Sequence, residues 1–419
     1  MDKTNSDIEK KLLVICDMFT PPAFLPRVRF FCDYLQQHGW NIDILTETPR
    51  TQTILPYNIY SLTFCQHNRI GGNVEWAMKT IISLFCDIKS RQFVKYANKS
   101  LNLKHYKAIL CSTFFTFPLP VAAQLAKQWQ IPWIADLRDI AEQAPRYTYL
   151  EHQPKGWFGN IMMQRYTQTN IKRRNNALEQ ANSIITISPW HTEFLKKFNS
   201  NTHTIFNGYD ANIFKNDRQA TNQFVICYTG KYYGKPLQDI TDLLTTLYEL
   251  VFLQKQISEQ KILFKWFSDD ASKQRLLKTI DQQHYSELLK IIAFSPLIPH
   301  EKIAETLNTS SIALIASNTA TNNGNHGIMT TKFYEALGCE CPVLCVKSDN
   351  ECLADAIKKT NIGIAAENVA DCKQFILNKY NEWETNKFTM VNVNKVEQQK
   401  YTRQHQAKQL YNILSTLTN

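Results

Sequence analysis

Residues Thr321–Val346, TNNGNHGIMTTKFYEALGCECPVLCV, decide how the second half of this chain is expected to fold. They begin as a polar loop with glycines, continue as a short helix that Thr330 and Thr331 can cap, and end in the apolar strand 342–346. A loop that enters a helix presents unpaired N–H groups and the positive end of the helix dipole, which together attract anions. The stretch therefore predicts an anion site in an α/β domain.

Two charged residues of this helix add to the predicted site. Lys332 brings a positive charge to its first turn, and Glu335 lies three residues later on the same face, where it can accept hydrogen bonds from hydroxyl groups. A phosphate at one end and a sugar hydroxyl at the other outline a nucleotide. An ordinary capped helix would have a similar sequence, so this stretch alone leaves both interpretations open.

Composition limits the remaining possibilities. The 419 residues are too many for one compact core, so we expect two domains, and 44% hydrophobic residues indicate a folded protein. The net charge of +10 suits nucleic acid, an anionic membrane surface or acidic small molecules, but the basic residues are dispersed and no nucleic-acid-binding motif is present. The 11 cysteines include no C-x-x-C pair, which favours reduced thiols. With no apolar run long enough to span a bilayer and no secretory signal, we expect a cytoplasmic protein.

The chain opens with a strand–helix–strand pattern. An apolar strand at 11–16 is followed by a helix at 29–38 and a strand at 40–45, which predicts a parallel sheet with ligands at the carboxyl ends of its strands. The loop after the first strand has prolines and lacks G-x-G-x-x-G, so a nicotinamide enzyme is disfavoured. The same alternation restarts with a strand at 223–228.

Charged residues follow two of the expected strands. The sequence DLRD, 136–139, follows the strand 131–135, and a glycine-containing loop with Lys231 and Lys235 follows the strand 223–228. Both groups fall at the edge of a parallel sheet where ligands bind. A structural Arg–Asp pair and two solvated lysines are the alternative interpretations.

Two segments mix basic and apolar residues. We expect a basic amphipathic helix at 75–99, and the segment 154–174 has five basic residues, no acidic ones and several aromatic and aliphatic side chains. Such segments suit an anionic membrane surface, and equally the packing of a helix against its own domain.

The order and spacing of several motifs resemble those of glycosyltransferase family 4. These motifs are PP-x3-PR (21–27), DLRD (136–139), IFNGYDANIF (205–214), YTGKYYGK (228–235), LIPHEKI (297–303) and TTKFYEALGCECPVL (330–344). The resemblance implies an α/β protein of GT-B fold: two Rossmann-like domains with parallel sheets facing across a cleft, and a C-terminal helix that crosses back to the N-terminal domain. The expected boundaries are 1–207 for the acceptor-side domain, 208–400 for the nucleotide-sugar domain and 401–419 for the helix.

The resemblance also assigns residues to the donor site. In this family, the glutamate at the position of Glu335 binds the nucleotide ribose. Lys231 and Lys235 fall where the family places a basic pair on the donor diphosphate, with Gly230, Thr330, Thr331 and Lys332 completing the donor site. The family signature has a second glutamate eight residues before the first, where this chain has Gly327, so His326 is a candidate to take over its role.

On the acceptor side, the resemblance points to DLRD and the first loop. Arg138 stands where many relatives have a histidine near the donor sugar, and a guanidinium stays protonated, so it cannot act as a base. We expect Arg138 and Asp139, together with Lys231 and Lys235 of the donor site, to have catalytic roles, and Arg27, Asp136, Arg138 and His326 to bind substrate.

The function implied is that of a retaining, hexosyltransferase-like glycosyltransferase. It would move a sugar from a UDP-, GDP- or other nucleotide sugar to a hydroxyl of a sugar or lipid-linked acceptor, in cell-surface polysaccharide or glycolipid synthesis. No cofactor or metal is expected, because the chain has no D-x-D pair. Peripheral contact with the inner face of an anionic membrane is a further expectation. The alternatives are a GT-B sugar-nucleotide epimerase and a catalytically silent binding subunit of a polysaccharide assembly complex.

Overall fold

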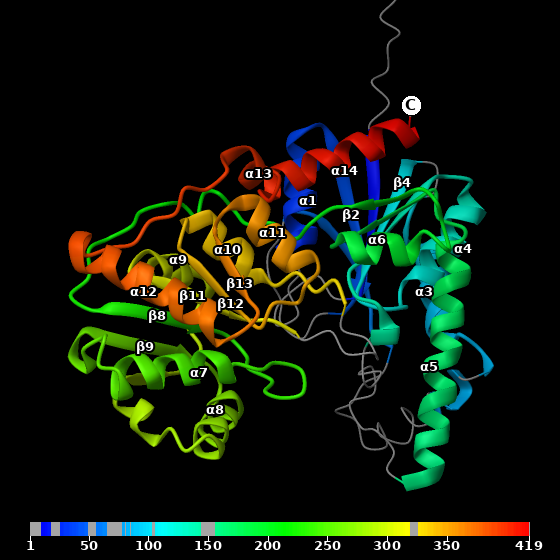
Figure 1. Ribbon diagram of the computed structural model, residues 1–419. Helices are drawn as coiled ribbons and strands as arrows, with labels where there is room; N and C mark the ends of the chain where they lie inside the picture. Colours follow the sequence, from blue (N-terminus) through cyan, green and yellow to red (C-terminus); the bar gives the residue numbers. More distant parts are fainter. Residues whose placement is uncertain are drawn as a thin grey trace, which may run out of the picture. The chain divides into compact units, whose positions relative to one another are not determined.

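The computed structural model describes residues 10–17, 26–48, 56–64, 78–79, 81–83, 85–102, 105–143, 156–318 and 326–418. The chain divides into two compact units, residues 1–206 with 407–419 and residues 207–406 (Figure 1). Parts of four predicted segments lie outside the described residues, namely 21–25 of the proline loop, 75–77, 80 and 84 of the basic amphipathic helix, 154–155 of the basic segment and 321–325 of the polar loop.

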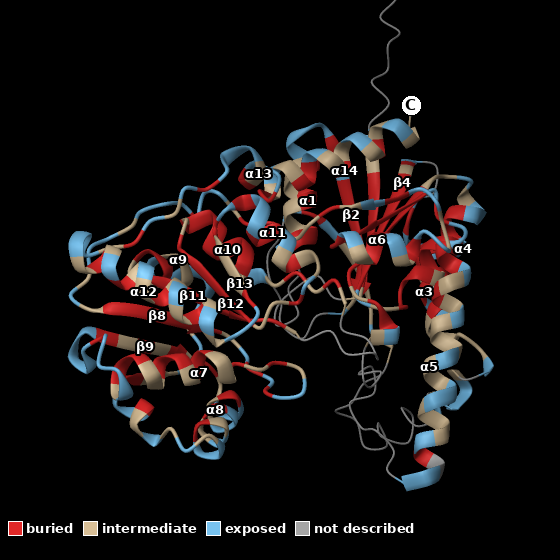
Figure 2. Cartoon of the chain, viewed as in Figure 1, coloured by how far each residue is buried: buried red, intermediate tan, exposed pale blue. Residues whose placement is uncertain are grey.

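The first unit contains a seven-stranded parallel sheet with the strand order β3-β2-β1-β4-β5-β6-β7. Its strands are β1 (Lys10–Cys16), β2 (Trp40–Glu47), β3 (Asn58–Leu62), β4 (Tyr106–Thr113), β5 (Trp133–Leu137), β6 (Ser183–Thr186) and β7 (Thr202–Thr204). Its helices are α1 (Pro26–Gln37), α3 (Ile88–Ser100), α4 (Leu119–Trp129), the 3-10 turn η2 (Ala141–Gln143), α5 (Gly156–Leu178) and α6 (Pro189–Leu195). The apolar run 12–15 of β1 is buried because helices cover both faces of a parallel sheet (Figure 2).

The second unit contains a six-stranded parallel sheet with the order β10-β9-β8-β11-β12-β13. Its strands are β8 (Phe224–Thr229), β9 (Ile262–Phe267), β10 (Ile292–Ser295), β11 (Ile312–Ala316), β12 (Val343–Val346) and β13 (Gly363–Ala366). Its helical elements are α7 (Thr241–Tyr248), the π-helical turn η3 (Glu249–Leu253), η4 (Glu259–Lys261), α8 (Asp270–Gln282), η5 (Ser286–Lys290), α9 (His300–Asn308), α10 (Thr331–Cys339), α11 (Cys352–Thr360), α12 (Val369–Asn386) and α13 (Lys395–Gln399). After β8, the strands β9 and β10 are added on one side of it, and β11, β12 and β13 are added on the other. The strand order therefore reverses between β8 and β11, which makes this pair the switch point of the sheet.

The last helix, α14 (Arg403–Thr418), begins in the second unit and continues in the first. Its apolar residues Ala407, Leu410 and Leu414 are buried in the core that α1 forms with the first sheet. This packing confirms the expected return of the C-terminal helix to the N-terminal domain.

The structure corrects the expectation of one continuous helix at 75–99. Residues 78–79, 81–83 and 85 are helical, but α3 begins afresh at Ile88, because the Asp87 side chain accepts a hydrogen bond of 3.1 Å from the N–H of Ser90 and caps the new helix. The long helix α12 was not expected from the sequence.

Candidate functional site

A pocket of about 510 Å³ lies at the carboxyl edge of the second sheet, beside the switch point between β8 and β11. This volume is typical of small-molecule sites, and switch points are where open α/β sheets bind ligands. The lining residues are Thr229, Gly230, Lys231, Tyr233, Gln238, Leu297, Ile298, Ile303, Ala316, Ser317, Asn318, Ile328, Thr330, Thr331, Lys332, Glu335 and Leu353. The pocket thus includes six of the predicted donor-site residues.

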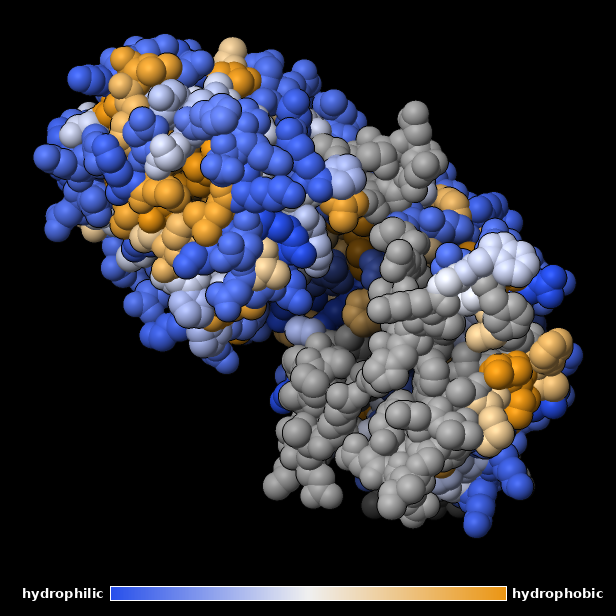
Figure 3. Space-filling view, turned by 90° about the horizontal axis from the view of Figure 1, so that it is seen from below, coloured by the Kyte–Doolittle hydropathy of each residue, from blue (hydrophilic) through white to orange (hydrophobic). Residues whose placement is uncertain are grey.

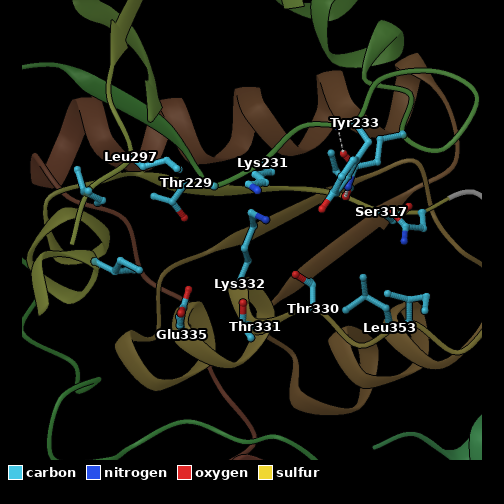
Figure 4. Close-up of a pocket in the computed structure, with 17 residues that line it drawn as sticks. Thr229, Lys231, Tyr233, Leu297, Ser317, Thr330, Thr331, Lys332, Glu335 and Leu353 are labelled. Carbon is cyan, nitrogen blue, oxygen red and sulfur yellow. Dashed lines mark hydrogen bonds between the residues drawn. The ribbon is translucent and has the colours of Figure 1, made fainter. Parts of the chain in front are cut away.

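Two lysines bring positive charge into this pocket. Figure 4 shows the Lys332 side chain extending from α10 toward Lys231, which follows β8. Gly230 makes room for it: a Cβ there would lie 3.2 Å from the Lys332 Nζ, and its φ of +109° favours glycine. The two amines therefore come from elements that are 100 residues apart in the chain and meet at the end of β8.

Glu335 is buried and Lys332 is half-buried, and no ion pair joins the two in the described parts of the chain. Burial lowers the pKa of Lys332, and the Glu335 carboxylate offsets part of this effect. Burial raises the pKa of Glu335 to about 7, against the opposing effects of Lys332 and Arg403. Buried charges that lack close partners, next to a cavity, are typical of ligand sites.

Glu335 has two basic neighbours that the sequence analysis did not assign. The Nε2 of His300 lies 3.8 Å from the Glu335 Oε1, and burial lowers the pKa of this histidine. Arg403 acts electrostatically on Glu335 and on Asp210, and its buried Nε has no hydrogen-bond partner in the described part of the chain. His300 lies within the LIPHEKI motif, but no pattern in the sequence links residue 403 to residue 335.

The pocket has two differently built ends. Figure 4 shows Leu297 and Glu335 toward one end, and Tyr233 and Ser317 toward the other, with Lys332 between them. The first end combines the apolar side chain of Leu297 with the Thr229 hydroxyl and the Glu335 carboxylate. An elongated ligand with an anionic centre would fit this arrangement of charges.

The walls of the pocket are fixed by backbone and amide hydrogen bonds. The Gln238 side chain donates to the carbonyl of Ala316 (3.0 Å) and accepts from the N–H of Tyr233 (2.8 Å), which ties the loop after β8 to the end of β11. Thr330 occupies the N-cap position of α10, yet its side chain makes no capping hydrogen bond. The first-turn N–H groups of α10 are thus not satisfied by this threonine, although the sequence suggested a cap.

Two predicted residues do not line the pocket. Lys235 is half exposed and its Nζ lies 3.1 Å from the Asp239 carboxylate. His326 is hydrogen-bonded through Nδ1 to Glu351, which also accepts a bond of 2.9 Å from the N–H of Gly327. The second amine in the pocket is therefore that of Lys332 rather than Lys235, and a carboxylate from the start of α11 lies against Gly327.

Arg27 and Asp136 lie in the first unit and bind one another. The Arg27 guanidinium contacts both carboxylate oxygens of Asp136 (3.3 and 3.1 Å) and donates to the carbonyls of Ile205 (2.7 Å) and Phe206 (2.5 Å). Ser112 donates to the same carboxylate at 2.7 Å. This buried network gives both residues a structural role, which is the alternative that the sequence left open for DLRD.

Arg138 and Asp139 lie beyond this network, just after β5. The Arg138 guanidinium lies 3.6 Å from the centroid of the Phe114 ring, and its buried Nε and Nη2 have no hydrogen-bond partner among the residues that the structure describes. Burial lowers the pKa of Arg138 and raises that of Asp139. Unlike Arg27, Arg138 therefore keeps donors that a ligand can use.

Neither the protein-family models nor the curated proteins include a match to this chain. Solved structures do match it along nearly its whole length. Sucrose-phosphate synthase from Thermosynechococcus elongatus is 15% identical over 97% of this chain and 99% of its own, with a TM-score of 0.61. Anabaena HepE in complex with UDP and glucose is 14% identical over 97% and 100%, with a TM-score of 0.63. A glycosyltransferase from Rickettsia africae is 10% identical over 98% of each chain, with a TM-score of 0.61. At such low identity these likenesses establish the fold, which is GT-B with two Rossmann-like domains.

Proposed function

We propose that this protein is a retaining glycosyltransferase that moves a sugar from a nucleotide diphosphate sugar to a hydroxyl acceptor. The observation that carries the proposal is the pocket at the end of β8, where two lysine amines and the uncapped start of α10 lie beside a buried carboxylate. Cations suit a diphosphate, and a carboxylate suits a ribose diol. The family resemblance of the motifs supports the choice of donor and of retention.

In this proposal, Lys231 and Lys332 bind the diphosphate and offset the charge that grows on it as the glycosidic bond to the donor breaks. The N–H groups at Thr330 and Thr331 add the helix dipole. Glu335 in its ionised form accepts hydrogen bonds from the ribose hydroxyls. No divalent metal is required in this scheme, because these fixed positive charges take the place that a metal would have.

Arg138 and Asp139 serve the acceptor side. The free donors of Arg138 suit an oxygen of the transferred sugar or of the acceptor, and Asp139 orients an acceptor hydroxyl. The departing phosphate oxygen takes the acceptor proton. We propose a sugar or lipid-linked sugar as the acceptor, in cell-surface polysaccharide or glycolipid synthesis.

The experiment is to incubate the purified protein with radiolabelled UDP-glucose and measure slow release of glucose or its transfer to added sugars. UDP-glucose is the first donor to test because HepE was solved with UDP and glucose. We expect UDP to form, and we expect Lys231→Ala to reduce its formation while the melting temperature stays unchanged. Full turnover in Lys231→Ala would contradict the site assignment.

The two alternatives give different products in the same assay. An epimerase would isomerise the sugar nucleotide without any acceptor and without UDP as a product. A silent binding subunit would bind the donor without turnover across a panel of UDP-, GDP- and other nucleotide sugars.

A further inference from the structure

An apolar stripe on the first unit faces water. Met78, Ile81, Ile82 and Phe85 have the spacing of one helix face, and they are 55%, 47%, 45% and 82% exposed. The hydrogen bond of 2.8 Å from the N–H of Cys86 to the carbonyl of Ile82 shows that the helical turn is formed. An apolar helix face of this kind normally packs against something, so its exposure indicates an interaction surface.

A basic stripe follows directly in the chain. Arg91, Lys95 and Lys99 are exposed at four-residue spacing on α3, while Phe93 and Ala97 of the same helix are buried in the core. Their ammonium and guanidinium groups form no ion pair with any residue the structure describes. Basic charge thus lies beside the exposed apolar stripe.

Helix α5 extends this surface. Both α3 and α5 pack against α4 and contribute buried side chains to the same hydrophobic core. Residues 156–178 of α5 include four basic residues and no acidic one. Trp157 is 80% exposed in its first turn, about 14 Å along the helix from Tyr166. Figure 3 shows hydrophobic surface among hydrophilic residues on the face of the molecule where these segments lie.

We propose that this docking surface (Met78, Ile81, Ile82, Phe85, Arg91, Lys95, Lys99 and Trp157) lies on an anionic lipid bilayer. Its apolar side chains would enter the boundary between head groups and acyl chains, and its basic side chains would bind lipid phosphates. An isologous dimer would instead bring the basic stripe against its own copy, where like charges repel. The chain would be held peripherally, since no helix in the described residues is long and apolar enough to cross a membrane.

The test is co-sedimentation of the full chain with vesicles of phosphatidylcholine alone or of equal parts phosphatidylcholine and phosphatidylglycerol. We expect binding to the anionic vesicles only, and weaker binding as salt is added. Arg91→Glu/Lys95→Glu removes two interfacial cations, so its binding should weaken about thirtyfold at least. Ile81→Ser/Phe85→Ser should weaken binding as well.

Two control variants lie in the second unit. Lys302→Glu/Lys359→Glu makes the same change in net charge at exposed sites, and Val396→Ser removes a side chain that is 72% exposed. Both should bind vesicles like the wild type, and melting temperatures verify folding of every variant.

Three results would overturn the proposal. The wild type could ignore anionic vesicles, or the control variants could lose as much binding as the docking-surface variants. Light scattering could also show a dimer in the wild type and a monomer in Ile81→Ser/Phe85→Ser, which would assign the surface to a second copy. None of these results depends on sugar transfer, so the proposed function stands or fails separately.

Discussion

The Arg27–Asp136 pair at the carboxyl edge of the first sheet and the Lys332–Glu335 pair at that of the second differ in how their charges are compensated. At the first edge, Arg27 and Asp136 are buried and bind each other, while Arg27 also donates to backbone carbonyls and Asp136 accepts from Ser112. At the second edge, Glu335 is buried and Lys332 is half-buried beside a cavity, with shifted pKa values and no ion pair between them in the described residues.

This difference distinguishes charges that stabilise the fold from charges that are available to bind a ligand. A buried ion pair that is fully hydrogen-bonded offsets its own desolvation, and it fixes the elements that contribute to it. Buried charges without partners lower stability, so they persist where a ligand completes them.

The largest effect on stability should come from the paired edge. Arg27→Ala leaves the Asp136 carboxylate without its arginine, which should lower the free energy of unfolding by about 3–5 kcal/mol in urea titrations. Arg29→Ala on the same helix is the matched control: its ion pair with Asp33 is exposed, with an N–O distance of 3.7 Å, so the loss should stay below about 1 kcal/mol. Equal losses of stability in the two variants would show that the buried Arg27–Asp136 pair contributes no more than the exposed Arg29–Asp33 pair.

At the other edge, the stability contribution of Glu335 should depend on pH. Because its pKa is raised in the folded protein to about 7, the folded state holds this proton more tightly than the unfolded state. The resulting stability is fully present below the usual pKa of a glutamate and is lost as the pH rises to about 7. Glu335→Gln should therefore gain stability relative to the wild type between pH 5 and pH 8, by up to about 3 kcal/mol.

Urea midpoints of both proteins at pH 5 and pH 8 measure this change. A constant difference between the two proteins at both pH values would contradict the assigned shift. UDP-glucose gives a second readout: if the ionised carboxylate is the form that binds, affinity should rise with pH up to about 7 in the wild type and stay flat in Glu335→Gln.

A smaller effect should come from the glycines of the loop after β8. Gly230 and Gly234 both have positive φ, so alanine at either position should cost about 1 kcal/mol of stability. Only at Gly230 would the new Cβ meet the Lys332 amine; at Gly234 it would contact the Arg275 side chain at 3.6 Å. Gly230→Ala should thus weaken UDP-glucose binding in calorimetry several-fold more than Gly234→Ala. Similar affinities in the two variants would show that the position of Lys332 does not matter.

The sequence predicted the fold and the location of the pocket better than it predicted which side chains line the pocket. Apolar runs such as 12–15 were sufficient to predict two α/β domains with parallel sheets, because buried parallel strands leave a strong hydrophobic pattern, while the GT-B fold was implied by the family resemblance. The helix break at Asp87 was missed, since a capping aspartate inside an amphipathic pattern looks like an ordinary polar residue.

Side-chain direction explains the errors in the site. Lys231 and Lys235 follow the same strand, but Lys235 turns to Asp239 while Lys332 enters the pocket beside Gly230. Spacing places residues along a loop and does not show which way they point. The electrostatic interaction of Arg403 with Glu335 could not be predicted from the sequence, because it depends on how the returning C-terminal part of the chain packs.

Lys332 is the residue that most clearly distinguishes the second edge from the first. We expect its amine to bind the donor diphosphate. Isothermal titration of UDP-glucose into the wild type, Lys332→Ala and Lys235→Ala tests this most directly. We predict about 100-fold weaker binding for Lys332→Ala, because it loses charge-assisted hydrogen bonds in a buried site, and affinity within about twofold of the wild type for Lys235→Ala. Equal affinity in the wild type and Lys332→Ala, or a larger loss in Lys235→Ala, would contradict the account.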